Sequence, residues 1–278
     1  MESRHARLNI PVEHDETDYL DFDAATIGKT TDTNADAYFI DAKSRSFGIF
    51  DGVGSIKNSA EAARIAASTA EDYLSSESFR QPYDLGKHAV KSALMAAHES
   101  ILEQGLNGET TAVVAKFYET PSGQPYIAIA HAGDSRAYRL SGAYLDQKTL
   151  DHGANYAPSD SAGAMLAQEI LANVVQYNGL SDRMMYLYKH RNVVTQVLGR
   201  RDHPPRPRVS THDVQPGQKW LLTTDGVHDN LTTEEIEYVV LAGEAVGGLV
   251  RAAYERSLDT EHFRSKRDDI TAVLASLK

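Results

Sequence analysis

The chain has 278 residues, 41% hydrophobic and 24% charged, which is typical of a soluble globular protein with one large core or two small ones. It has no cysteine, which excludes disulfides, thiolate metal sites and a cysteine nucleophile. The formal net charge of −11 disfavours a nucleic-acid partner, because a polyphosphate backbone would be repelled. No run approaches the roughly 18 apolar residues that cross a bilayer, and the polar N-terminus lacks the apolar segment of a secretory signal. We therefore expect a cytoplasmic protein with no membrane partner.

The first half of the chain has strand patterns on both sides of a helical region. The first twenty residues are polar and predict an N-terminal arm over residues 1–24. Apolar residues at helical spacing predict two consecutive helices, and β-rich runs divided by turn residues predict the strands. In chain order, we expect strands at 37–41 and 46–50, helices at 59–74 and 85–106, and strands at 110–118, 126–131 and 135–140.

The second half begins with a helical region, residues 153–198, with apolar faces at 164–175 and 184–198. After a proline-rich link, we expect strands at 209–214 and 220–224, helices at 232–241 and 244–258, and a closing strand at 270–277. Grouped strands and grouped helices favour an α+β protein with antiparallel sheets covered by helices over a repeated βαβ winding. The common glycine-rich nucleotide-binding loops are absent from the sequence.

Aspartates stand where apolar strands meet turns. They are Asp36, Asp51, Asp134, Asp225 and the pair Asp268 and Asp269. A tight turn explains any single Asp-Gly pair, but several such junctions in one chain weaken that explanation. Clustered carboxylates raise one another's pKa unless a cation neutralises them, and hard oxygen ligands suit Mg²⁺ or Mn²⁺. The pattern indicates a metal site, provided that these residues meet in space.

The segments that carry these residues resemble the ordered motif series of the metal-dependent (type 2C) protein phosphatases, in their bacterial branch. The resemblance covers roughly residues 25–278. Its segments are NADA (34–37), FGIFDGVG (47–54), GETTA (108–112), HAGDSRAY (131–138), LLTTDGVHDN (221–230) and RDDIT (267–271). One such motif is weak evidence, but six in this order are specific.

The resemblance implies a four-layer α-β-β-α sandwich, in which two antiparallel sheets are flanked by helix pairs. Residues 153–192 would form a flap beside the catalytic groove. The resemblance also implies two bound Mg²⁺ or Mn²⁺ ions. Asp51 would bridge them and Asp225 would complete the catalytic pair of residues, and a third ion is implied beside Asp134. The implied metal-site residues are Asp36, Asp51, Gly52, Asp134, Asp225 and Asp268.

The implied activity is hydrolysis of phosphoserine and phosphothreonine in proteins, by a water that two metal ions activate. The partner would be a phosphoprotein, the target of a serine/threonine kinase. Two departures from the family pattern bear on this. Thr31 stands where many members have a phosphate-binding arginine, although Lys29 nearby supplies a point charge, and Ala35 stands where an acid is common. The alternative is therefore a catalytically weak pseudophosphatase that binds a phosphorylated partner.

Three histidines invite acid–base roles. We expect His131 to be packed and hydrogen-bonded, since it ends a strand. His152 lies in the region that begins the flap, where packing is the simpler interpretation and contact with a metal-bound water is the alternative. We expect His228 to face the solvent.

Overall fold

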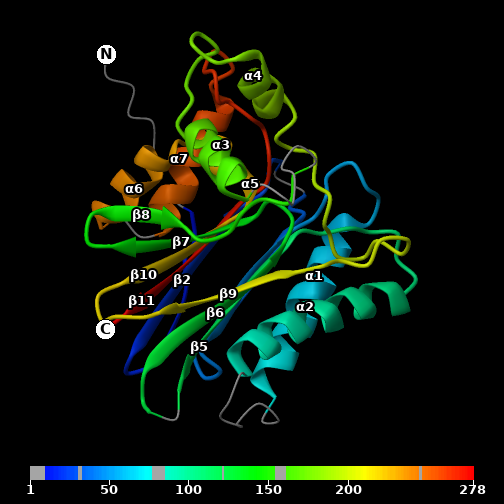
Figure 1. Ribbon diagram of the computed structural model, residues 1–278. Coiled ribbons are helices and arrows are strands. Elements are labelled where there is room, and N and C mark those ends of the chain that lie inside the picture. Colours follow the sequence, from blue (N-terminus) through cyan, green and yellow to red (C-terminus); the bar gives the residue numbers. More distant parts are fainter. Residues whose placement is uncertain (1–9, 31–32, 77–84, 121, 154–160, 244–245) are drawn as a thin grey trace.

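Two antiparallel sheets lie face to face, with helices on both outer faces (Figure 1). The computed structural model describes residues 10–30, 33–76, 85–120, 122–153, 161–243 and 246–278. The predicted α+β sandwich of four layers is confirmed. In the described residues, no helix is both long enough and apolar enough to cross a membrane.

The first sheet has six strands in the order β1-β2-β11-β10-β7-β8. The three central strands are antiparallel neighbours, because β10 pairs with both β11 and β7. The strands are β1 (Glu13–Glu16), β2 (Leu20–Ile27), β7 (Arg136–Ser141), β8 (Tyr144–Gln147), β10 (Lys219–Thr223) and β11 (Ile270–Leu277).

The second sheet has five strands in the order β3-β4-β5-β6-β9. Its first two strands form the predicted hairpin, and the long strands β5 and β6 form the next. The strands are β3 (Asp36–Asp41), β4 (Ser46–Asp51), β5 (Ala112–Glu119), β6 (Pro125–Ala132) and β9 (Arg208–Asp213).

The helices cover the sheets in two groups. The Ala-rich helices α1 (Ser59–Ser75) and α2 (Leu85–Glu103) pack on the second sheet, because small side chains allow close approach. On the first sheet lie α6 (Thr233–Leu241) and α7 (Val246–Leu258). A capping box fixes the start of α6, since Thr232 and Glu235 each bond the other's backbone N–H. A third apolar cluster, with Phe22, Phe47 and Trp220, fills the space between the sheets.

The N-terminal prediction was wrong where it described an arm. Residues 13–16 and 20–27 form β1 and β2, and β2 pairs with β11 along its whole length. The acidic residues alternate with apolar ones, as on a strand with one buried face: Leu20 and Phe22 are buried, whereas Asp21 and Asp23 are partly buried. Residues 1–9 of the predicted arm lie outside the described residues.

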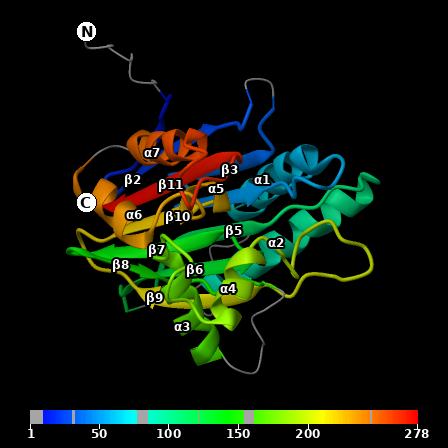
Figure 2. The ribbon, with the colours of Figure 1, turned by 90° about the horizontal axis from the view of Figure 1, so that it is seen from above.

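The insertion between β8 and β9 also differs from the prediction. It contains α3 (Ser161–Ala172) and α4 (Asp182–Lys189), so the expected helical stretch at 184–198 ends early. The helix α4 ends at Lys189, with His190 as its C-cap, and loop residues lead from there to β9. Both helices lie beyond the ends of the strands, near the short helix α5 (Asp225–His228) (Figure 1). Figure 2 looks down on this end, with α7 on one side and α3 on the other.

Candidate metal centre

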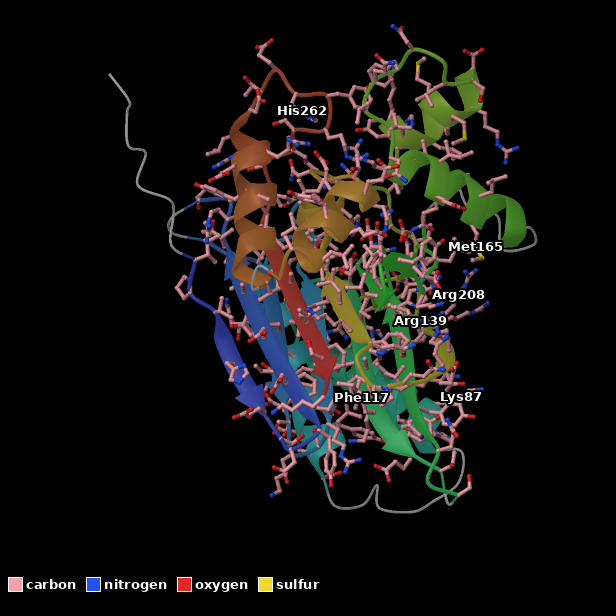
Figure 3. All side chains as sticks on the ribbon, turned by 90° about the vertical axis from the view of Figure 1, so that its left-hand side faces the viewer. Lys87, Phe117, Arg139, Met165, Arg208 and His262 are labelled. Carbon is pink, nitrogen blue, oxygen red and sulfur yellow. The ribbon has the colours of Figure 1, made fainter. Side chains whose placement is uncertain are left out.

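The strand register carries the predicted aspartates to the same end of the sandwich. Asp36 begins β3 and is the Cα partner of Asp51, which ends β4. In the other sheet, Thr223 pairs with Ala272 and with Arg136. The residues that follow β10 or precede β11 and β7 therefore emerge together. These residues are Asp134, Asp225 and Asp268. In Figure 3, Met165 on α3 lies toward this end and Phe117 on β5 toward the other.

The electrostatics of Asp51 show that these carboxylates converge. Burial raises the pKa of Asp51 well above its ordinary value, and nearby negative charges raise it further. The neighbouring carboxylates that act in this direction are those of Asp36, Asp134, Asp225 and Asp268. We call these five residues, Asp51 included, the carboxylate cluster. Its members come from both sheets and span more than two hundred positions of sequence.

Asp36 is a buried member of the carboxylate cluster. Thr271 and Thr224 donate their hydroxyls to its Oδ2 atom at 2.7 and 2.9 Å. Its Oδ1 atom is buried and has no hydrogen-bond partner among the described residues. Burial, followed by the charges of Asp269 and Asp225, raises the pKa of Asp36 to about 8. A buried carboxylate oxygen without a hydrogen-bond partner destabilises the fold unless a cation lies close to it.

A lysine lies among the remaining carboxylates. The ammonium of Lys266 is 2.5 Å from Asp225 Oδ2 and 3.0 Å from Asp268 Oδ2. It is also 2.8 Å from Asp229 Oδ2, and Arg191 bonds the other oxygen of Asp229 at 3.0 Å. Burial raises the pKa of Asp225 to about 6, although Lys266 opposes that shift. Sequence analysis missed Lys266, because one lysine before an acidic motif looks like ordinary surface charge; its position two residues before Asp268 was the available signal.

The carboxylate oxygens of the cluster are spread more widely than ligands of one ion. In the described chain, a single group of three or more acidic or histidine side chains has ligand atoms all within 4.8 Å of one another, namely His14, Glu16 and Asp21. That group is at an exposed edge, where Lys278 already pairs with Glu16 and Asp21 at 2.8 Å.

Comparisons with known proteins agree with this arrangement. The profile of the family described as "Protein phosphatase 2C" matches residues 29–261. The chain belongs to the protein phosphatase 2C family. The predicted enzyme class, a serine/threonine protein phosphatase, is confirmed at the level of this family. A search of curated proteins by sequence found no match.

Solved structures share the fold. The Mycobacterium tuberculosis serine/threonine phosphatase PstP/Ppp has a TM-score of 0.69 and 20% identity, over 94% of this chain and 99% of that one. The PPM Ser-Thr phosphatase MsPP from Mycobacterium smegmatis, in complex with cacodylate, has a TM-score of 0.68 and 20% identity, over 92% and 98%. The catalytic domain of PstP with two manganese ions has a TM-score of 0.67 and 19% identity, over 93% and 98%.

The donor set of this phosphatase fits hard divalent cations. The carboxylate cluster supplies oxygen atoms only, which suits Mg²⁺ or Mn²⁺, and the orphaned Oδ1 of Asp36 is a free ligand atom. Gly52 follows Asp51 where a side chain has no room, since a Cβ atom would lie 2.8 Å from the carbonyl oxygen of Ala35. The backbone of Gly52 can thus lie close to the cluster. The roles of these residues as ligands stay predictions.

Lys29 lies beside the same loop. Its ammonium is 3.7 Å from Asp269 Oδ2. A Cβ atom on Gly54 would lie 3.5 Å from the same ammonium. Asp269 accepts hydrogen bonds from the backbone N–H groups of Lys29 and Ala35 at 2.7 and 3.0 Å. Asp269 therefore holds the loop that carries Lys29. Thr31 lies outside the described residues.

The three histidines are all buried side chains of the phosphatase. His131 bonds the carbonyl oxygen of Leu150 at 2.9 Å and stacks on His152, with ring centroids 4.8 Å apart. His152 accepts a hydrogen bond from the backbone N–H of Gly133, as packing predicts. Burial lowers the pKa of His131 to about 4 and that of His152 to about 3. The prediction for His228 was wrong: it is 3% exposed and bonds Thr223, because α5 turns it inward.

The insertion of the phosphatase is tied to the metal-centre end by one buried arginine. Arg264 donates to the carbonyl oxygens of Leu171 and Val174 at 3.2 and 3.0 Å, and to that of His228 in α5. Phe263, its neighbour in sequence, packs edge-on against Tyr177 with centroids 4.7 Å apart. The predicted flap, residues 153–192, thus rests on the loop that leads to Lys266 and Asp268. Residues 154–160 of it lie outside the described residues.

Proposed function

We propose that this phosphatase hydrolyses phosphoserine and phosphothreonine in proteins, with the carboxylate cluster holding two divalent cations. The observation that carries the proposal is the convergence on Asp51 of four further carboxylates, in a member of a phosphatase family. When bound, the cations would lower the pKa of a water molecule and offset the negative charge of the phosphoryl oxygens. The proposal includes a third cation beside Asp134, a cytoplasmic location for this protein, and a phosphoprotein substrate that a serine/threonine kinase has modified.

The chain's own residues have distinct parts in this proposal. The charges of Asp36 in the second sheet and of Asp225 and Asp268 in the first all act on Asp51, so its carboxylate would face both cations. Asp225 and Asp268 approach from the first sheet, and Asp36 is oriented by the hydroxyls of Thr224 and Thr271. Gly52 would offer a backbone carbonyl. Fixing these oxygens before substrate arrives is what makes electrostatic stabilisation effective.

Phosphopeptide turnover tests the proposal. Purified protein is assayed for phosphate release from phosphoserine and phosphothreonine peptides, with Mn²⁺, with Mg²⁺ and with a chelator. We expect turnover that the chelator abolishes, and a loss of at least about a hundredfold in kcat for Asp225→Asn, which keeps the shape of the side chain. Asp51→Ala is expected to remove Mn²⁺ binding as well. Asp213→Asn, at the exposed end of β9, is the matched control.

The alternative, a pseudophosphatase that binds a phosphorylated partner, draws support from Ala35 and from the lysine among the aspartates. The same preparation separates the two functions. Phosphopeptide binding without any phosphate release at millimolar Mn²⁺ favours the binding protein. Faster release from nucleotides than from phosphopeptides would instead indicate a hydrolase of small phosphoesters.

A further inference from the structure

Lys266 lies among carboxylates of the proposed metal centre. Its ammonium contacts one oxygen each of Asp225, Asp229 and Asp268, at 2.5, 2.8 and 3.0 Å. Its side chain is only 18% exposed, so water screens these charges poorly. Two of the three carboxylates, those of Asp225 and Asp268, belong to the carboxylate cluster.

The backbone fixes the origin of this side chain. The N–H of Lys266 donates to Asn230 Oδ1 at 2.9 Å, and its carbonyl oxygen accepts from Asn230 Nδ2 at 2.9 Å. Asn230 is itself fully buried and also donates to the carbonyl oxygen of Gly226. The backbone of Lys266 is therefore anchored beside α5, from where its ammonium reaches Asp225.

The ammonium and a divalent cation are expected to exclude each other beside Asp225 and Asp268. A small divalent cation binds its oxygen ligands at about 2 Å, so a cation held by Asp225 and Asp268 would compete with the ammonium for the same oxygens. The like charges would also repel strongly in so dry a position. Asp229 offers a second position for the ammonium, since its Oδ2 is already 2.8 Å away and the residue lies one helical turn beyond Asp225.

We propose that Lys266 is a built-in competitor for the divalent cation at Asp225 and Asp268, and that its ammonium retreats onto Asp229 when the cation binds. The inference rests on the proposed function for the existence of the metal centre. Its consequence is regulatory: the phosphatase binds the cation at this position weakly, and becomes loaded only when the concentration of free cation is high. In the metal-free protein, the same ammonium stabilises the fold by offsetting the carboxylates.

Calorimetric titration with Mn²⁺ tests the competition without any assay of activity. The metal-free full chain is compared with Lys266→Ser, which leaves space for an ion, and with Lys266→Met, which keeps the length of the side chain but not its charge. We expect the weakest Mn²⁺-binding step to become at least about tenfold tighter in both variants. We also expect a lower melting temperature without metal and a larger rise on adding Mn²⁺.

Lys219→Ser is the matched control, because Lys219 begins β10 and so lies at the opposite end of that strand from Asp225. It is expected to bind Mn²⁺ like the unaltered chain. If the Lys266 variants bind Mn²⁺ within about threefold of the unaltered chain, the competition is refuted and the metal centre stands. If none of the four chains binds Mn²⁺, both the metal centre and the competition fail.

Discussion

Thr271 donates its hydroxyl to Asp36 Oδ2 over 2.7 Å, and so joins β11 of one sheet to β3 of the other. Asp36 receives a second hydroxyl from Thr224, at 2.9 Å. Both bonds favour the charged form of a carboxyl whose burial favours the neutral one. The two threonines thus prepare a buried carboxylate for a cation.

Thr271→Val removes one of these bonds and keeps the shape of the side chain. We expect Mn²⁺ affinity to fall by about tenfold, because the carboxylate loses an orienting donor and is protonated more readily. Calorimetric titration at neutral pH measures the change. Thr211→Val, on β9 at the edge of the other sheet, is the control. Unchanged affinity in Thr271→Val would show that Asp36 does not contribute to metal binding.

The stability of the metal-free protein is expected to fall between pH 6.5 and 8. Since the folded pKa of Asp36, about 8, lies above its unfolded value of 3.8, the stability that it contributes is complete below 3.8 and is lost as pH rises to 8. The buried histidines His131 and His152 have lowered pKa values, so their contribution is lost as pH falls below 6.5 and is constant above it. Carboxylates therefore dominate this window.

Melting temperatures in chelator across this window measure the effect. The Asp36→Asn variant is the control, because it cannot ionise at this position and its curve is expected to be flatter. Added Mn²⁺ is expected to oppose the fall, since metal binding requires the deprotonated carboxylates. A metal-free melting temperature that rises from pH 6.5 to 8 would contradict the expected sign.

Much of the fold followed from sequence because its signals are local. The hairpin of β3 and β4 shows the alternation of strands, and the Ala-rich helices show helical spacing of apolar residues. Each aspartate of the carboxylate cluster follows or precedes an apolar strand. Local signals failed where tertiary contacts determine whether a side chain is buried. His228 looks solvent-facing until α5 turns it toward Thr223, and Lys266 looks like surface charge until three aspartates surround it. The strand β2 was hidden by its partly exposed acidic side.

Lys29 is the candidate residue for substrate phosphate, and its neutralisation tests that prediction. We expect Lys29→Ala to raise KM for a phosphopeptide by about tenfold, with a smaller change in kcat, because a point charge contributes mainly to binding. Lys57→Ala is the matched control, since Lys57 is exposed in the loop after β4. An equal change in both variants would indicate a general effect of net charge. An effect on kcat alone would argue against contact with the bound phosphate.

Arg264 is expected to hold the insertion against the metal-centre end. Its guanidinium is buried, and it donates to the carbonyl oxygens of Leu171 in the last turn of α3, of Val174 just after that helix, and of His228 in α5. Arg264→Met leaves these oxygens without their charged donor, which costs about 2 kcal/mol. Most of that cost is expected as local opening, because the insertion has a small apolar cluster of its own.

Hydrogen exchange measures this opening directly. In Arg264→Met, the amides of α3 and α4 are expected to exchange at least about tenfold faster, whereas those of β5 and β6 in the second sheet keep their protection. Arg183→Met is the control, since Arg183 is an exposed arginine of the same insertion. Faster exchange throughout both sheets would mean that Arg264 stabilises the whole fold. Unchanged exchange in α3 would mean that apolar packing around Phe263 and Tyr188 suffices to hold the insertion in place.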